Sequence, residues 1–250
     1  MTVAPARHVI LGATGGIGSA LARRLAASGS RLVVAGRDED KLAALADETG
    51  AVACAFDATD LASVARCIAT GVERHGGIDG VANCVGSLLL KPAHLTSLEE
   101  WNSTLAVNLT SAFATVRAAA RAMLRSGGSI VLVSSAAAQV GLANHEAIAA
   151  AKAGVTGLAL AAAASYAPHG IRVNCVAPGL VRTPLTARLT ASEAGLKTST
   201  AMHPLGRIGE PDDVAAALAW LLDPAQSWVT GQVLGVDGGL ANIRPRAVAR

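Results

Sequence analysis

Aromatic side chains are the scarcest feature of this 250-residue chain. Three Trp, two Phe and a single Tyr make up 2% of it, whereas hydrophobic residues as a whole make up 52%. A core built on large aromatic clusters is therefore excluded. The abundance of alanine and glycine instead predicts helices that pack closely through small side chains.

The chain also lacks a strong charge and a long apolar run. Its net charge of +3 is too small to indicate a nucleic-acid partner. The run Val155 to Ala164 is apolar but about half as long as a membrane span requires. The N-terminus has no apolar core of the signal-peptide type. We therefore expect a cytoplasmic protein with neither a nucleic-acid nor a membrane partner.

The four cysteines have no spacing typical of a metal site. They are Cys54, Cys67, Cys84 and Cys175, and three of them fall in or beside predicted apolar strands. Buried cysteine commonly acts as a small core residue. We expect that role for all four, and we predict no metal site.

Strand-like and helix-like segments alternate along the whole chain. Strands are expected at 7–13, 31–35, 51–56, 80–85, 129–134, 171–176 and 232–236. Helices are expected at 17–28, 40–48, 61–74, 98–125, 144–166 and 211–222. This alternation predicts one α/β domain over residues 1–250, with a doubly wound parallel sheet of about seven strands, the Rossmann fold. The long irregular segment at about 180–209 is expected to form a lid over the substrate.

Three glycines follow the first strand and open the first helix. Gly12, Gly16 and Gly18 have the spacing G-x-x-x-G-x-G. Glycines allow a tight turn and a close approach to a pyrophosphate, and a helix N-terminus offers free N–H groups to it. The position between strand and helix favours a dinucleotide-binding turn over a simple structural turn.

The end of the second strand bears on the choice of dinucleotide. NAD-binding proteins commonly place an acidic residue here, but this chain has Gly36 followed by Arg37. An arginine can pair with the 2′-phosphate of NADP. We therefore predict that NADP(H) is preferred and that NAD(H) is possible, unless Arg37 is only a solvated surface residue.

Further segments stand in a fixed order along residues 5–240. After GATGGIG at Gly12 to Gly18 come Asp57, NCVG at Asn83 to Gly86, Asn108, Ser134-Ser135, Pro178-Gly179 with Thr183, and VDGG at Val236 to Gly239. In this order they resemble the short-chain dehydrogenase/reductase family. The C-terminal segments, which begin with PLGR at Pro204 to Arg207, resemble the subgroup that contains 3-oxoacyl-carrier-protein reductases.

The resemblance implies a set of cofactor contacts and an assembly. Asp57 is expected at the adenine ring, Lys152 at the nicotinamide ribose and Thr183 on the nicotinamide side. The full cofactor-binding set that it implies is Gly12, Thr14, Gly15, Gly16, Ile17, Gly18, Asp57, Asn83, Gly86, Lys152, Pro178, Gly179 and Thr183. Members of the family pair their two long helices between subunits, which implies a homo-oligomer, most simply a tetramer.

The catalytic segment departs from the family pattern at one position. Members have Ser, twelve residues, Tyr, three residues and Lys. Here Ser135, twelve residues, Ile148, three residues and Lys152 keep both spacings without a gap. In the family, the tyrosine exchanges the proton with the carbonyl oxygen, the serine polarises the carbonyl, and Asn108 matches the asparagine that holds a water. A general acid contributes about 10²–10⁴ in rate, so its absence predicts slow carbonyl reduction unless another donor acts.

Four other side chains are weighed as that donor. His145 lies three residues before Ile148, on nearly the same helix face, and an imidazole can donate a proton near neutral pH. Alternatively it is only a polar residue of the first turn, next to Asn144 as a possible N-cap. Glu146 points to another side of the helix, and His203 lies in the expected lid. Tyr166, the only tyrosine, follows Lys152 by fourteen residues, about 21 Å along a helix, and is excluded within one subunit.

Three functions remain open. The first is an NADP(H)-dependent oxidoreductase with an altered proton path, acting on a partly apolar small molecule or on an activated C=C bond. The second is a catalytically impaired, cofactor-binding partner subunit of an active homologue. The third is a cofactor sensor or scaffold. The catalytic residues that we predict for the first function are Asn108, Ser135, Lys152 and His145.

Overall fold

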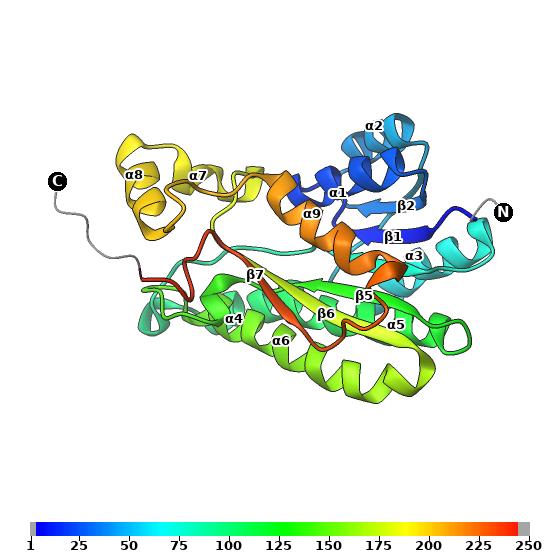
Figure 1. Ribbon diagram of the computed structural model, residues 1–250. Helices are drawn as coiled ribbons and strands as arrows, with labels where there is room; N and C mark the ends of the chain where they lie inside the picture. Colours follow the sequence, from blue (N-terminus) through cyan, green and yellow to red (C-terminus); the bar gives the residue numbers. More distant parts are fainter. Residues whose placement is uncertain (1–3, 245–250) are drawn as a thin grey trace.

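A seven-stranded parallel sheet forms the centre of the protein (Figure 1). The computed structural model describes residues 4–244. The strands lie in the order β3-β2-β1-β4-β5-β6-β7, which confirms the predicted doubly wound fold. Their bounds are β1 Arg7–Leu11, β2 Arg31–Gly36, β3 Val52–Ala55, β4 Gly80–Asn83, β5 Gly128–Val133, β6 Ile171–Pro178 and β7 Val233–Val236. The order reverses between β1 and β4, where Leu11 pairs with Asn83, and in such sheets ligands bind at this switch point.

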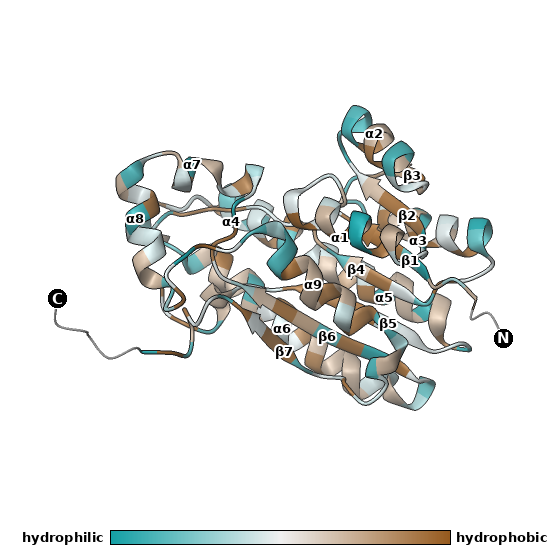
Figure 2. Ribbon diagram, turned by 45° about the horizontal axis from the view of Figure 1, so that its top comes forward, coloured by the Kyte–Doolittle hydropathy of each residue, from teal (hydrophilic) through white to brown (hydrophobic). Residues whose placement is uncertain are grey.

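Three helices cover one face of the sheet: α1 (Gly16–Ala27), α2 (Glu39–Thr49) and α9 (Pro211–Leu222). The other face is covered by α3 (Leu61–His75), α5 (Ser111–Met123) and α6 (Glu146–Tyr166). Figure 2 shows the hydrophobic colouring along the strands and on the helix sides that meet them. Both faces of the sheet are therefore buried, which explains why several strands are apolar throughout.

The long helix expected at 98–125 is divided into three parts. It consists of α4 (Leu98–Leu105), a π-helical segment (Ala106–Thr110) and α5. A capping box starts α4, in which Ser97 and Glu100 each bind the other's backbone N–H. The π-helical segment contains Asn108, and such segments occur frequently at functional sites.

The start of α6 corrects one prediction. The helix begins at Glu146, with His145 at the N-cap position, and Asn144 lies outside it with a φ of 64°. Asn144 is thus not the N-cap; asparagine is one of the few residues that adopt this left-handed conformation readily. The turn at Asn144 places His145 at the N-terminal end of α6.

The segment expected to be irregular contains two helices. These are α7 (Ala187–Thr190) and α8 (Glu193–Met202), which stand at the end of the molecule where β6 leads into them (Figure 1). The Ser192 hydroxyl accepts a hydrogen bond from the N–H of Gly195 and caps α8. Both helices are short and largely exposed, so the apolar periodicity that identifies a core helix is weak here.

Within residues 4–244, one helical stretch is long and apolar enough to cross a membrane by length and composition alone. It is Glu146–His169, formed by α6 and the turn after it, and an 18-residue window within it has a mean hydropathy of 1.6. We expected no such stretch. Its inner side packs on β5 and β6, as the core helix of a globular domain does, and this packing accounts for its composition.

Candidate cofactor and substrate site

A cavity of about 440 Å³ opens at the carboxyl edge of the sheet. The turn after β1, the segments after β4, β5 and β6, and helices α6 to α8 all contribute to its walls. It brings together these predicted site residues: Thr14, Gly15, Gly16, Ile17, Gly18, Gly86, Ser135, His145, Lys152, Pro178, Gly179 and Thr183. A larger hollow of about 1020 Å³ lies at the opposite edge and contains none of them.

The glycine turn is shaped to approach a ligand closely. Gly12 has a φ of 76°, and a Cβ on it would lie 2.8 Å from the carbonyl carbon of Cys84. A Cβ on Gly16 would lie 2.8 Å from Cγ2 of Thr183. Helix α1 begins at Gly16, and no side chain caps its first N–H groups. These free donors at a helix N-terminus fit a pyrophosphate.

The segment after β4 is fixed by Asn83 and kept open by Gly86. The Asn83 amide donates to the Thr115 hydroxyl over 3.0 Å and accepts from the N–H of Val85 over 2.9 Å. A Cβ on Gly86 would lie 3.6 Å from Nζ of Lys152. Asn83 therefore shapes the site from within the core, and Gly86 leaves space in front of the lysine.

Lys152 is a cation held almost out of solvent. Its side chain is 6% exposed, and Nζ donates to the Val133 carbonyl over 2.8 Å. Burial lowers the pKa of Lys152 to about 8. The thiols of Cys84 and Cys175 lie nearby, but burial raises the pKa of each to about 12, so both stay neutral. The ammonium group can therefore donate to further hydroxyl oxygens, such as those of a ribose.

The two serines that follow β5, Ser134 and Ser135, have different roles. The Ser134 hydroxyl donates to the backbone carbonyl of Lys152 over 2.9 Å, which ties the strand to α6. The Ser135 hydroxyl accepts from the N–H of Ala137 over 3.1 Å and lines the cavity. Because that bond uses only an acceptor lone pair, the Ser135 hydroxyl keeps its proton for a substrate oxygen.

Asn108 supports the cavity wall from behind. Its side chain is 2% exposed, accepts from the N–H of Ser87 over 3.1 Å, and donates to the Ser87 hydroxyl over 2.8 Å. It also donates to the Thr104 carbonyl. The side chain thus secures the segment after Gly86, while the predicted water-holding role stays a prediction.

Ile148 and His145 line the same cavity, one helical turn apart. Ile148 is 3% exposed and offers no proton. Nδ1 of His145 lies 2.8 Å from the Ala143 carbonyl and must donate to it, since a carbonyl only accepts. Nε2 is therefore the nitrogen left to meet a substrate, and among the described residues no hydrogen bond engages it.

The other proton-donor candidates are less suited. His203 is buried, its Nδ1 donates to the Ser199 carbonyl, and its Nε2 accepts from the N–H of Leu180. Both of its nitrogens are thus occupied, although the ring borders the cavity. Glu146 accepts from the N–H of Ala93 and lies outside the cavity wall. Tyr166 ends α6 and packs on the core.

Arg37 and Asp57 lie beyond the cavity wall, at the ends of β2 and β3. The Arg37 side chain is exposed, and Asp57 accepts from the backbone and hydroxyl of Thr59. A Cβ on Gly36 would lie 2.7 Å from Cγ2 of Thr14, so a carboxylate at position 36 has no room unless Thr14 moves. The packing of Thr14 thus favours glycine at position 36.

Several lining residues were missed from the sequence. They are Lys41, Leu88, Leu90 and Leu142. Lys41 follows Arg37 by four residues in the first turn of α2, a spacing that could have indicated a second cation. The leucines follow strand ends, a position that itself favours a site. From the segment 180–209, Leu185, Leu189 and Met202 also line the cavity, whereas Leu196 does not.

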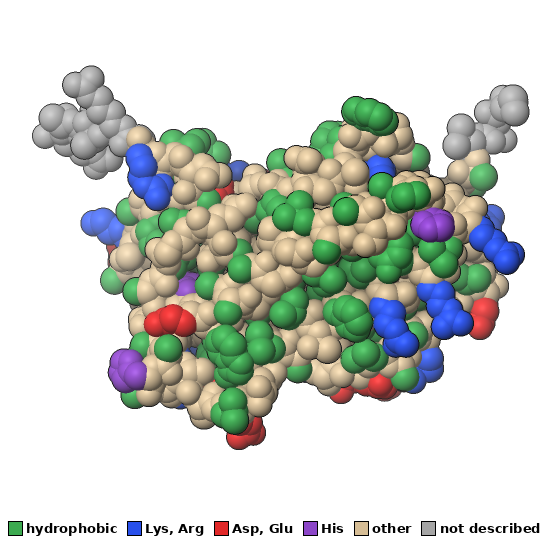
Figure 3. All heavy atoms as spheres, turned by 90° about the horizontal axis from the view of Figure 1, so that it is seen from below, with side chains coloured by type: hydrophobic (Ala, Val, Ile, Leu, Met, Phe, Trp, Pro, Cys, Tyr) green, Lys and Arg blue, Asp and Glu red, His purple; other side chains and the backbone are tan. Residues whose placement is uncertain are grey.

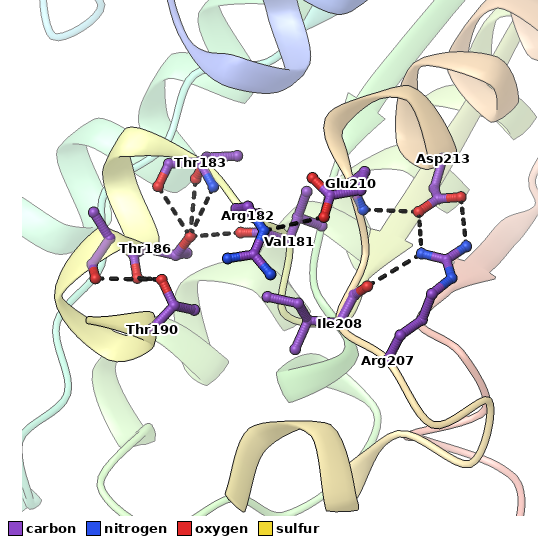
Figure 4. Close-up of polar contacts among 10 residues, drawn as sticks. Val181, Arg182, Thr183, Thr186, Thr190, Arg207, Ile208, Glu210 and Asp213 are labelled. Atoms are coloured by element: carbon purple, nitrogen blue, oxygen red, sulfur yellow. Dashed lines mark hydrogen bonds and ion pairs between the residues drawn. The ribbon is translucent and has the colours of Figure 1, made fainter. Parts of the chain in front are cut away.

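The lid is fastened where it leaves and rejoins the domain (Figure 4). Val181 and Gly209 form an isolated parallel β-bridge. Arg182 pairs with Glu210 over 3.1 Å, and Arg207 binds both carboxylate oxygens of Asp213 at 2.6 and 2.8 Å. Within the lid, the Thr186 hydroxyl contacts the carbonyls of Val181 and Thr183. Both ends of the lid thus attach to the start of α9.

Comparison with known proteins agrees with this geometry. The sequence profile of the family described as enoyl-(acyl carrier protein) reductase matches residues 12–241. A 2,5-dichloro-2,5-cyclohexadiene-1,4-diol dehydrogenase from Sphingobium indicum is 37% identical, over 94% of this chain and 96% of its own length.

Two solved structures have the same fold over nearly the whole chain. A short-chain type dehydrogenase/reductase from Mycobacterium ulcerans has a TM-score of 0.92 and 33% identity, over 96% of this chain and 91% of that one. An actinorhodin polyketide ketoreductase variant, solved with NADPH, has a TM-score of 0.91 and 31% identity, over 97% of this chain and 100% of that one. The ordered motifs, the sheet order, the glycine turn and these matches lead to one conclusion: the chain belongs to the short-chain dehydrogenase/reductase family.

Proposed function

We propose that this protein is an NADP(H)-dependent oxidoreductase of a partly apolar small molecule, in which His145 replaces the absent tyrosine as proton donor. One observation carries the proposal. His145 lines the same cavity as Ser135, Ile148 and Lys152, and its anchored Nδ1 leaves Nε2 for a substrate.

Each residue then has a defined task. The N–H groups at the start of α1 bind the pyrophosphate, and Lys152 binds ribose hydroxyls. The dinucleotide, when bound, supplies or accepts a hydride. The Ser135 hydroxyl donates a hydrogen bond to the substrate oxygen, and protonated His145 gives up its Nε2 proton as that oxygen gains charge. In the oxidative direction, neutral Nε2 accepts the proton.

NADP(H) is the cofactor that we propose in preference to NAD(H). Thr14 occupies the space that a carboxylate at position 36 would need, and exposed Arg37 follows directly. Lys41, at the cavity wall, adds a second cation although Asp38 pairs with it over 2.6 Å. The similar ketoreductase structure with NADPH supports the same choice.

The proposed substrate is a compact ring or chain with one alcohol or carbonyl group. Leucines from four segments and Met202 supply the apolar surface, and the polar groups gather around Ser135 and His145. A similar protein is named for its action on a substituted cyclohexadienediol, which has this combination of apolar ring and hydroxyl.

We also propose a homo-oligomer, most simply a tetramer. Phe113 on α5 and Leu160 on α6 are 47% and 50% exposed. Figure 3 views the face that includes these helices and shows hydrophobic side chains over its middle, with charged side chains mainly nearer the edges. Covering this face with a second copy would remove apolar surface from water.

The deciding experiment measures turnover with NADPH or NADP⁺ against a panel of cyclic alcohols, ketones and activated alkenes. Turnover that is lost in His145→Asn supports the proposal. If NADPH binds but neither wild type nor Ile148→Tyr turns over any substrate, the partner-subunit hypothesis is favoured. Co-purification of an active homologous subunit would then identify that role.

A further inference from the structure

We propose that Cys54 and Cys67 form a peroxide-reactive thiol pair that closes to an intramolecular disulfide. This modification site is separate from the proposed active site and does not depend on its function. The two Sγ atoms lie 2.8 Å apart, one on β3 and the other on α3. Thirteen positions separate them in sequence, and the fold brings them into direct contact.

The two thiols differ in exposure, as an attacking and a resolving thiol should. Cys54 is partly exposed on β3, which is the edge strand of the sheet and pairs only with β2. Cys67 is fully buried, in the core between the sheet and α3. A small oxidant from solvent can therefore reach Cys54 first, while Cys67 is shielded in the core.

The surroundings favour a thiolate on Cys54. The hydrogen bond from Cys67 is the main cause that lowers the pKa of Cys54 to about 7, with help from Thr70 and the charge of Arg66. The same pairing, together with burial, raises the pKa of Cys67 well above its usual value. The exposed sulfur is thus the nucleophile, because the thiolate is the reactive form.

The chemistry balances with hydrogen peroxide as oxidant. The Cys54 thiolate attacks one peroxide oxygen, the O–O bond breaks, and hydroxide leaves, so that Cys54 becomes a sulfenic acid. The Cys67 thiol then attacks that sulfur, the S–O bond breaks, and water leaves. In sum, two thiols and one peroxide give one disulfide and two waters.

The disulfide would tie the edge strand to the helix beside the adenosine end of the cofactor cleft. The chain between the cysteines contains Asp57 and the helix N-cap Asp60, whose carboxylate accepts from the N–H groups of Ala62 and Ser63. Closing a loop of this size restricts the unfolded chain. We expect the melting temperature to rise by about 5–10 °C on oxidation.

The test treats the full-length protein with hydrogen peroxide, then denatures and alkylates it for peptide mass spectrometry. The expected result is one cross-linked species, Cys54 to Cys67, with Cys84 and Cys175 still alkylated. Retention of all four thiols at peroxide doses that oxidise a model dithiol would overturn the proposal. So would a cross-link that forms only between two chains.

Two variants separate the roles of the thiols. Cys67→Ser, whose hydroxyl can still donate to the Cys54 sulfur, should leave a sulfenic acid on Cys54, which a dimedone adduct detects, and should lose the rise in melting temperature. Cys54→Ser should give no dimedone adduct at Cys67. Cys84→Ala is the matched control, in which the cross-link should form as in wild type. A dimedone adduct that appears equally at every cysteine would contradict the assigned roles.

Discussion

Ser134 and Lys152 are joined by a hydrogen bond of 2.9 Å, from the serine hydroxyl to the lysine backbone carbonyl. Lys152 returns to the same strand through its ammonium group, which donates to Val133 over 2.8 Å. These two bonds fix where α6 lies along its own axis relative to the C-terminal end of β5. Position 148, one turn earlier on α6, is therefore held at the cavity wall regardless of the side chain that it bears.

Ile148→Tyr is expected to create or raise carbonyl reductase activity. The new hydroxyl would join Ser135 and Lys152 at one cavity, and a general acid is worth about 10²–10⁴ in rate. The gain falls below this range if the pocket that holds isoleucine orients the phenol poorly. The measurement is NADPH oxidation with a panel of ketones and aldehydes, compared with wild type.

Ile148→Phe is the matched control, because it adds the same ring without the hydroxyl. It should show no gain over wild type. An equal gain in both variants would mean that ring packing, and not proton donation, causes the effect.

His145→Asn is expected to lower kcat by about 10²-fold or more, within the range of a lost general acid or base. The side-chain NH2 of asparagine can take the place of Nδ1 and donate to the Ala143 carbonyl, but an amide cannot exchange a proton with a substrate. The NADPH dissociation constant should stay unchanged, because His145 is not among the expected cofactor contacts. Unchanged kcat would remove the imidazole from the mechanism.

Arg37→Glu is expected to reverse the cofactor preference. A charged hydrogen bond to the 2′-phosphate is worth about 1.5–3 kcal/mol, so NADPH affinity should fall by about tenfold or more. NADH should bind as well as before or better. Fluorescence titration of both cofactors provides the measurement, and Arg31→Glu, at the far end of β2, serves as a charge-matched control. Equal wild-type affinities for the two cofactors would contradict the proposed preference.

Acid should destabilise the protein through His8. This side chain is 3% exposed, neither ring nitrogen has a hydrogen-bond partner among residues 4–244, and burial lowers its pKa to about 4. Between the ordinary value near 6.5 and 4, the unfolded chain binds a proton that the folded chain does not. The free energy of unfolding therefore falls as pH drops through this window, by about 3 kcal/mol in all.

His8→Leu isolates this contribution. The urea midpoint is measured at pH 7.5 and pH 5 in the wild type and in the variant. The change in midpoint between the two pH values is then compared between the two proteins, so that the contributions of other titrating groups cancel. The variant should lose less stability between these values than wild type. An identical loss in both proteins would show that His8 does not contribute.

The proposed assembly predicts that charge on the face formed by α5 and α6 blocks association. Phe113→Asp should shift the mass measured by light scattering toward the monomer at micromolar concentration, because a carboxylate cannot be buried there without a partner. Leu205→Asp, which charges an exposed leucine outside α5 and α6, is the control. A monomeric wild type would contradict the oligomer directly.

The fold, and the placement of Ser135, Ile148 and Lys152 around one cavity, could be predicted from the sequence for a physical reason. Doubly buried strands must be apolar, and a helix keeps its residues in phase, so Ser135, Ile148 and Lys152 can be aligned by counting. The glycine turn can also be predicted from the sequence, since only glycine fits the positive φ of Gly12 and its close contact with Cys84.

Other features depend on contacts between distant segments. The contact between Cys54 and Cys67 requires the packing of an edge strand on a helix, which no spacing encodes. The two bonds of His203 come from the lid and from the end of β6, so its occupied ring is visible only in the fold. The helices of the lid were missed because exposed helices need little apolar periodicity.

The Val181–Gly209 bridge brings the two ends of the segment 182–208 together. Because the lid starts and returns at neighbouring points, its length can vary at small entropic cost to chain closure. The segment 182–208 can thus be exchanged on a scaffold that keeps the glycine turn and Lys152, provided that Thr183, which faces Gly16, is retained. Exchanging that segment between relatives would transfer Leu185, Leu189 and Met202, and with them part of the apolar cavity wall, in one step.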